Sequence, residues 1–235
     1  MSSKRKYSQS AARRRRTRKN GQKWKRCVLT ISGAAIFILL LCGVISFVWG
    51  RKTKQTANDT KKLPKITIDT KLIQKNKYSR PGIELKEVNG VVIHYTANPK
   101  TDAIDNRNYF NNLPKSNKGK VNPVYASSHF VIGLEGQIVQ CIPLNEMAYA
   151  SNDRNTDTIA IECCHPDDSG KFNQLTYRAL IELTAYLCIR FDLDENDVIR
   201  HYDVTGKQCP RYFVQNEDKW EIFRDDVKLA INGLL

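Results

Sequence analysis

Two histidines stand where segments suited to strands reach their ends, and one cysteine lies on a loop shortly after the second histidine. His94 follows the apolar run "GVVI", His201 follows "DVIR", and Cys209 lies eight residues further on. Strand ends are rigid, so they can hold metal ligands accurately. Two imidazoles and one thiolate make a zinc site with three protein ligands and a fourth position for water. The alternative is that each histidine is an ordinary hydrogen-bonded residue and Cys209 a small buried hydrophobe.

Apolar patterns after Ile83 predict the elements that position these residues. Strands are expected over 90–95, 127–133, 137–142, 157–164 and 197–201, and helices over 102–113, 176–191 and near the C-terminus. Thr101 and Thr176 are candidate helix caps, and Pro114 is expected to end the first helix. Interleaved strands and helices over this length predict an α/β fold with a central mixed β-sheet flanked by helices.

The positive charge of the chain belongs to its N-terminal part. Residues 1–26 contain 12 Lys and Arg and no acid, and residues 51–82 contain 10 basic and 2 acidic residues. The whole chain has 38 basic and 24 acidic residues, so 16 basic and 22 acidic residues remain from Ile83 onward. A mildly acidic domain disfavours nucleic acid as a partner.

Residues 27–50 carry no charge and follow the basic tail. A helix of this length is about 36 Å long and crosses a hydrocarbon core of about 30 Å. We expect a single transmembrane helix with residues 1–26 cytoplasmic and the domain outside the cell membrane. The alternative, a cleaved signal peptide, has a shorter apolar region and a small-residue cleavage site. Residues 51–82 are interpreted as a basic linker and 83–235 as the folded domain.

Four segments in order resemble the zinc-dependent N-acetylmuramoyl-L-alanine amidases of type 2, which are related to peptidoglycan recognition proteins and phage endolysins. They are "VVIHYTANP" (91–99), "ASSHFVIGLEGQIVQCIPLNEMA" (126–148), "TIAIECC" (158–164) and "RHYDVTGKQCP" (200–210). The resemblance implies a Zn²⁺ site of His94, His201 and Cys209, the same residues as above.

The same resemblance implies two catalytic residues. Glu162, at the end of "IAIE", matches the family's general base, which would take a proton from zinc-activated water. Lys207 matches a lysine two residues before the cysteine, and its ammonium would stabilise the oxyanion. His129 matches a position that is not a ligand, and His165 is interpreted as a loop residue.

The chain departs from the family pattern at two places. Ser128 stands where some branches have a tyrosine, which puts a tyrosine-assisted mechanism in doubt. Tyr149 and Ala150 stand where many relatives have a tryptophan–histidine pattern, so one group that contacts the substrate is missing.

The predicted function is hydrolysis of the amide between the lactyl group of N-acetylmuramic acid and L-alanine of the peptidoglycan stem. We expect a monomer that is anchored to the membrane and has no nucleic-acid partner. One alternative is a muropeptide sensor with the same fold and no turnover. A second is a membrane-tethered nucleic-acid binder that uses the basic tail.

Overall fold

The computed structural model describes Leu63 and residues 65–235, which fold around a six-stranded sheet. The strands are β1 (Ile68–Thr70), β2 (Val91–Tyr95), β3 (Phe130–Ile132), β4 (Ile138–Gln140), β5 (Ile159–Cys163) and β6 (Val198–Arg200). Their order is β1-β4-β3-β5-β2-β6, and only the β3–β4 pair among the named strands is antiparallel. The predicted α/β fold with a central mixed sheet is confirmed.

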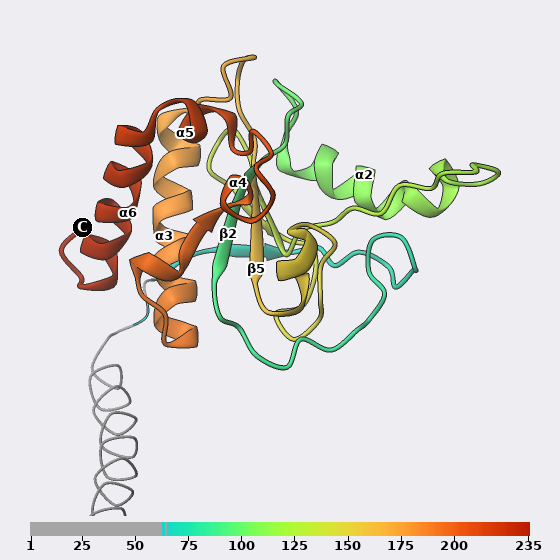
Figure 1. The fold of residues 1–235 in the computed structure, drawn as a ribbon, viewed down its shortest axis with the longest axis horizontal. Helices are drawn as coiled ribbons and strands as arrows, with labels where there is room; N and C mark the ends of the chain where they lie inside the picture. The colour runs from blue at the N-terminus through green and yellow to red at the C-terminus, as the bar shows by residue number, and fades with distance from the viewer. Residues whose placement is uncertain (1–62, 64) are drawn as a thin grey trace, which may run out of the picture. The chain divides into compact units, whose positions relative to one another are not determined.

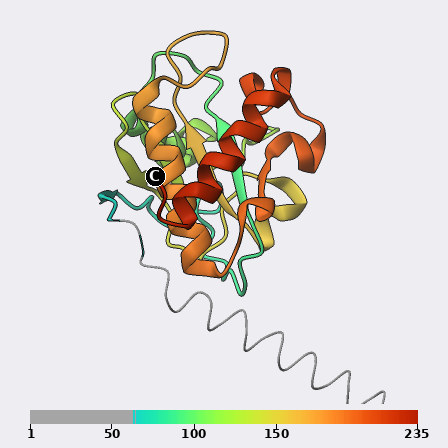
Figure 2. The same ribbon diagram turned by 90° about the vertical axis from the view of Figure 1, so that its left-hand side faces the viewer.

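Helices lie on both faces of this sheet (Figure 1). They are α2 (Ala103–Ser116), α3 (Gln174–Phe191), α4 (His201–Thr205), α5 (Arg211–Gln215) and α6 (Glu217–Ile231), with short 3-10 helices η1 (Asn152–Thr156) and η2 (Glu195–Asp197). Helices α3 and α6 lie side by side on one face, as Figure 2 shows, and α2 contacts β3 and β4 on the other.

The alternation of side chains along β2 and β5 creates two different faces. Ile93 and Ile161 belong to the large apolar core shared with α3 and α6. Side chains of successive strand residues point to opposite faces. His94 and Glu162 therefore point to the face on which α2 packs. Since α2 covers the β3–β4 half of that face, the half formed by β5, β2 and β6 is left for the site.

The predicted elements are present, with differences at their ends. The expected hairpin is β3–β4, where Gly136 adopts the left-handed conformation at φ 77°. Asp102 rather than Thr101 is the N-cap of α2, and this helix continues past Pro114 to Ser116. Asn173 rather than Thr176 caps α3, since its side chain accepts a hydrogen bond from the Thr176 N–H. Capping positions depend on local backbone geometry, which a hydrophobic pattern does not specify.

The expected linker over 51–82 is wrong from Ile68 onward. Strand β1 pairs in parallel with β4, and Ile73 is fully buried in a second apolar cluster with α2. Arg80 donates two hydrogen bonds to the Glu146 carboxylate, at 2.7 and 2.8 Å. The error has a physical reason: a three-residue edge strand gains its hydrogen bonds from a neighbouring strand, so a polar, lysine-rich sequence suffices. The folded domain begins before residue 83.

The expected transmembrane helix over 27–50 and the tail over 1–26 lie outside the described residues. Among Leu63 and residues 65–235, no helix combines the length and the apolar character needed to cross a bilayer.

Candidate metal centre

Two neighbouring strands place His94 beside Glu162. The two residues are register partners in the parallel pair of β2 and β5, and His94 is 2% exposed. Register partners in neighbouring strands point to the same face of a sheet. The imidazole and the carboxylate therefore extend from adjacent strands to the same side.

The third strand of the site supplies His201. Strand β6 pairs with β2 on the side away from β5, and His201 is the first residue of α4, directly after β6. The rings of His94 and His201 lie with their centroids 4.7 Å apart. A parallel arrangement of β5, β2 and β6 thus brings residues from three distant segments to one edge.

A tight loop after α4 returns the chain to these rings. Gly206 caps α4 in the left-handed conformation, at φ 75°, which favours glycine. The Tyr202 N–H donates to the Cys209 carbonyl at 2.9 Å, which closes the loop. The Cys209 thiol lies 3.7 Å from His94 Nδ1. Nitrogen and sulfur atoms of His94, His201 and Cys209 all lie within 4.8 Å of one another.

The hydrogen bonds around the two rings fit a metal between them. His94 Nε2 lies 3.2 Å from Ser151 Oγ, and His201 Nε2 lies 3.0 Å from Asn152 Oδ1. His201 Nδ1 is buried without a hydrogen-bond partner, an unusual state for a polar atom. Two imidazoles and one thiol converge there, a set of donors that suits zinc. The residues present therefore fit a zinc ion.

Burial gives the two histidines the protonation state that metal binding requires. Burial, with the charges of His201 and Lys207, holds the pKa of His94 well below its usual value. Burial and Lys207 also lower the pKa of His201. Both rings are therefore neutral near pH 7 and keep a lone pair for a metal. Burial, with a contribution from Glu162, raises the pKa of Cys209 to about 12, so metal binding must displace its proton.

Glu162 is a partly buried acid whose Oε2 is buried and has no hydrogen-bond partner. Burial raises its pKa to about 8, and the positive charge of Lys207 opposes this rise. A carboxyl group with such a pKa can both accept and release a proton near neutral pH. Lys207 itself is exposed on the loop between α4 and Cys209. The structure thus brings all five predicted site residues into one region.

The other two histidines have partners of their own. His129 Nδ1 accepts from the Ala160 N–H at 3.0 Å, and His129 Nε2 lies 2.9 Å from the Glu146 carbonyl. His129 is not part of the cluster formed by His94, His201 and Cys209. His165 follows β5 on a loop but is 1% exposed, with its ring 5.1 Å from that of Tyr95. The interpretation of His165 as a loop residue omitted this burial.

The sequence did not reveal Ser151 and Asn152 as members of the site. They follow Tyr149 and Ala150, the pair noted for lacking a family histidine. Serine and asparagine are common in turns, so their types alone carry no signal. Ser128, at the position of the missing tyrosine, is fully buried, and its Oγ lies 2.9 Å from both the Phe130 and the Ala160 carbonyl oxygens, to either of which its single proton can be donated.

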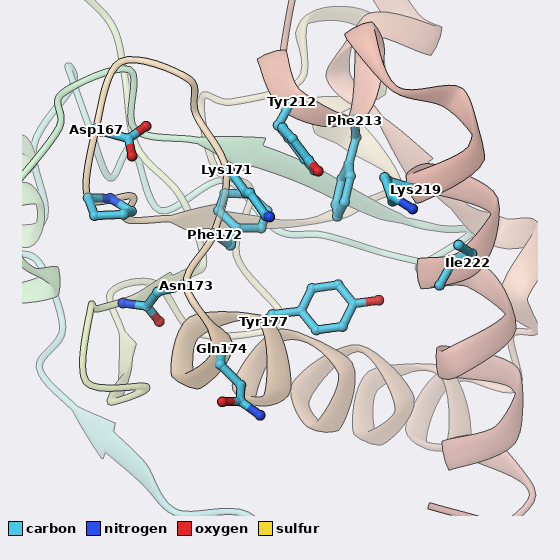
Figure 3. A pocket seen from close by; sticks show the side chains of 11 residues that line it. Asp167, Lys171, Phe172, Asn173, Gln174, Tyr177, Tyr212, Phe213, Lys219 and Ile222 are labelled. Atoms are coloured by element: carbon cyan, nitrogen blue, oxygen red, sulfur yellow. The ribbon is translucent and has the colours of Figure 1, made fainter.

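A cavity of about 510 Å³ lies elsewhere in the domain (Figure 3). It is lined by residues of the loop after β5 and of α3, α5 and α6, including Lys171, Tyr177, Tyr212 and Lys219. None of the five predicted site residues lines it. The metal centre is therefore separate from this cavity.

Known proteins of one family resemble this chain both in sequence and in fold. The family model for N-acetylmuramoyl-L-alanine amidase (Amidase_2) matches residues 84–212. The chain is 35% identical over 179 residues to the N-acetylmuramoyl-L-alanine amidase BlyA of Bacillus subtilis (strain 168). The aligned region covers 67% of this chain and 46% of BlyA. The chain is also 35% identical over 174 residues to the amidase CwlL of Bacillus licheniformis, covering 69% and 47%. The chain spans about half the length of the curated relatives it matches.

A solved structure of the catalytic domain of XlyA is also similar, with 25% identity and a TM-score of 0.56. The similarity covers 69% of this chain and 99% of that one. The fold matches that of PlyL as well, with 24% identity, a TM-score of 0.57, and coverage of 69% and 98%. Because the family model matches more than half of the chain, the chain belongs to the N-acetylmuramoyl-L-alanine amidase family.

Proposed function

We propose that this chain hydrolyses the amide bond between the lactyl group of N-acetylmuramic acid and L-alanine of the peptidoglycan stem. The observation that carries the proposal is the convergence of His94, His201 and Cys209 in the part of the site where Glu162 also lies. The names of the relatives, N-acetylmuramoyl-L-alanine amidases, specify the bond. A sensor without turnover does not need Glu162 and Lys207 beside three metal-binding side chains, and their presence argues against the non-catalytic alternative.

Zinc would be held by His94, His201 and Cys209, and when bound it would supply Lewis-acid polarisation of the scissile carbonyl and acidify a water molecule. Glu162 accepts the proton of the attacking water, and Oε2 is the available atom since it has no other partner. The same carboxyl group then delivers the proton to the leaving amine of alanine. Burial raises the pKa of Glu162 to about 8, so the carboxyl group can keep this proton near neutral pH between the two steps.

Lys207 stabilises the negative charge that develops on the carbonyl oxygen. Its ammonium influences the pKa values of His94, Glu162 and Cys209, so its charge acts throughout the site. The side chain is exposed, which allows it to move toward a bound substrate. A cation placed at a developing oxyanion stabilises the transition state more than the ground state.

Lys207→Met is expected to lower kcat by about 10²–10³-fold with little change in KM, since the oxyanion exists only in the transition state. Steady-state hydrolysis of a defined muropeptide measures both constants. Lys219→Met is the matched control, because Lys219 lies at the separate cavity and should leave both constants unchanged. An equal loss in the two variants would contradict the role of Lys207.

Mass spectrometry of purified peptidoglycan digested by the full-length protein tests the proposed function. We expect free stem peptides that begin with L-alanine, together with glycan that keeps intact lactyl groups. A chelator should abolish their release, and added zinc should restore it. If zinc-loaded protein binds muropeptide but releases no stem peptide, the non-catalytic sensor is the correct assignment.

We also propose that residues 27–50 anchor the chain in the cell membrane, with residues 1–26 cytoplasmic and the domain outside. The support is the uncharged stretch of 24 residues with a strongly basic flank on one side. Protease treatment of intact spheroplasts should degrade the domain and spare the N-terminal tail. A tail that is degraded while the domain is protected would reverse the orientation.

A further inference from the structure

One two-residue segment outside the predicted ligand set reaches both histidines. Ser151 and Asn152 are consecutive at the start of η1, and their side chains meet Nε2 of His94 at 3.2 Å and Nε2 of His201 at 3.0 Å. We propose that Asn152 is a positioning residue of the metal centre. Its amide oxygen holds His201 in the tautomer and ring orientation that presents Nδ1 to the metal. The inference rests on the metal site of the proposed function.

Asn152 decides the tautomer because its contacting atom can only accept. With Oδ1 as the partner, His201 Nε2 must carry the proton and donate it. The single N–H proton of the neutral ring is then on Nε2, and Nδ1 keeps its lone pair. Of the two ring nitrogens of His201, Nδ1 is the one that is buried without a hydrogen-bond partner. The hydrogen bond therefore directs the lone pair of His201 into the cluster with Cys209.

Ser151 does not impose the same choice on His94. A hydroxyl group can donate or accept, so Ser151 Oγ is compatible with either tautomer of that ring. The contact at 3.2 Å is also longer than the Asn152 contact. We therefore expect the loss of the Asn152 side chain to affect metal binding more than the loss of the Ser151 hydroxyl.

The turn itself does not depend on the Asn152 side chain. Asn155 Oδ1 accepts from the backbone N–H groups of Ala150 and Ser151, at 2.9 and 2.6 Å, and holds the segment in place. Asn152 is exposed and adopts the left-handed conformation at φ 52°. Asparagine and aspartate tolerate this conformation, and glycine adopts it at no cost. Substitution by glycine therefore removes the acceptor oxygen, and substitution by aspartate keeps it. Both residues tolerate the left-handed backbone conformation at position 152.

The zinc affinity of full-length Asn152→Gly and Asn152→Asp, measured by competition with a chromophoric chelator, tests the proposal. We expect Asn152→Gly to bind zinc about 10–100-fold more weakly, the usual effect of removing such a partner. Asn152→Asp keeps an acceptor oxygen and should bind zinc at least as tightly as the wild type. Unchanged affinity in Asn152→Gly, or equal weakening in both variants, would overturn the proposal. Ser151→Ala should weaken binding less than Asn152→Gly, and the reverse order would also overturn it.

Imidazole nitrogen chemical shifts of the metal-free protein report the tautomer of His201. Loss of folding would not produce the expected change in these shifts. The wild type and Asn152→Asp should show His201 protonated at Nε2 alone, and Asn152→Gly should show a mixture of tautomers. An unchanged signature in Asn152→Gly would contradict the role of Asn152. Neither measurement uses the substrate, so zinc binding as described without any release of stem peptide would refute only the proposed function.

Discussion

Replacement of Glu162 by glutamine is expected to lower kcat/KM for muropeptide hydrolysis by about 10²–10⁴-fold, the range of general acid–base catalysis. Glutamine keeps the shape of the side chain but cannot take the proton of the attacking water. The zinc content should stay at the wild-type level, since Glu162 is outside the predicted ligand set. Turnover of defined muropeptide and metal analysis of the same sample check both statements.

The same variant should be more stable than the wild type in the metal-free state. Burial raises the folded-state pKa of Glu162 from 4.5 to about 8. A raised pKa means that the folded state binds the proton more tightly than the unfolded state. The wild type therefore loses stability relative to Glu162→Gln as the pH rises from about 4.5 to about 8, and the difference is constant above that range.

Urea unfolding of chelator-treated protein measures this difference. At pH 8 the free energy of unfolding of Glu162→Gln should exceed that of the wild type by more than about 1 kcal/mol, and near pH 4 the gap should close. A gap of the same size at both pH values would show that the carboxylate charge is not its source. Lower activity together with higher stability is the expected signature of a residue kept for chemistry.

Cys209→Ser is expected to weaken zinc binding by more than about 100-fold and to reduce hydrolysis to background. Loss of a ligand should exceed the 10–100-fold effect of losing a partner of a ligand. A hydroxyl group is a much poorer ligand for zinc than a thiolate, and the two histidines alone leave the site incomplete. Equilibrium dialysis and muropeptide turnover measure the two losses.

Cys141→Ser is the matched control, because it makes the same atomic change in a fully buried cysteine of the apolar cluster under α2. We expect this variant to lose stability and to keep wild-type zinc affinity. If Cys141→Ser lost zinc as strongly as Cys209→Ser, the effect would come from general damage to the core rather than from the site.

The sequence patterns predicted the sheet well where strands are buried on both faces. The runs that became β2 and β5 are continuous and apolar, so their burial and pairing follow from composition. The two metal-site histidines could also be predicted, because His94 lies near the end of a buried strand and His201 directly follows one. Cys209 lies on a loop eight residues after His201, and it is predicted from its residue type and this short spacing. Position relative to a buried strand is a local property, and the sequence displays it.

Two features could not be predicted for a common reason. Strand β1 and the Ser151–Asn152 segment are polar, short and without periodicity, and their roles come from partners far away in the sequence. Ile68 pairs with Ile138, and Asn152 bonds to His201, 49 positions later. Hydrogen bonds of this kind stabilise a tertiary arrangement, and a pattern of residue types contains no record of the partner.

The pairing of β1 with the sheet also sets the length of the linker between the proposed membrane span and the folded domain. With the proposed membrane span ending at Gly50, only residues 51–67 separate it from Ile68. At no more than about 3.6 Å per residue, these 17 residues reach at most about 60 Å. A linker that ran to residue 82 would reach nearly twice as far. If residues 27–50 span the membrane as proposed, the docked strand would confine the proposed hydrolysis to the cell-wall layers closest to the membrane.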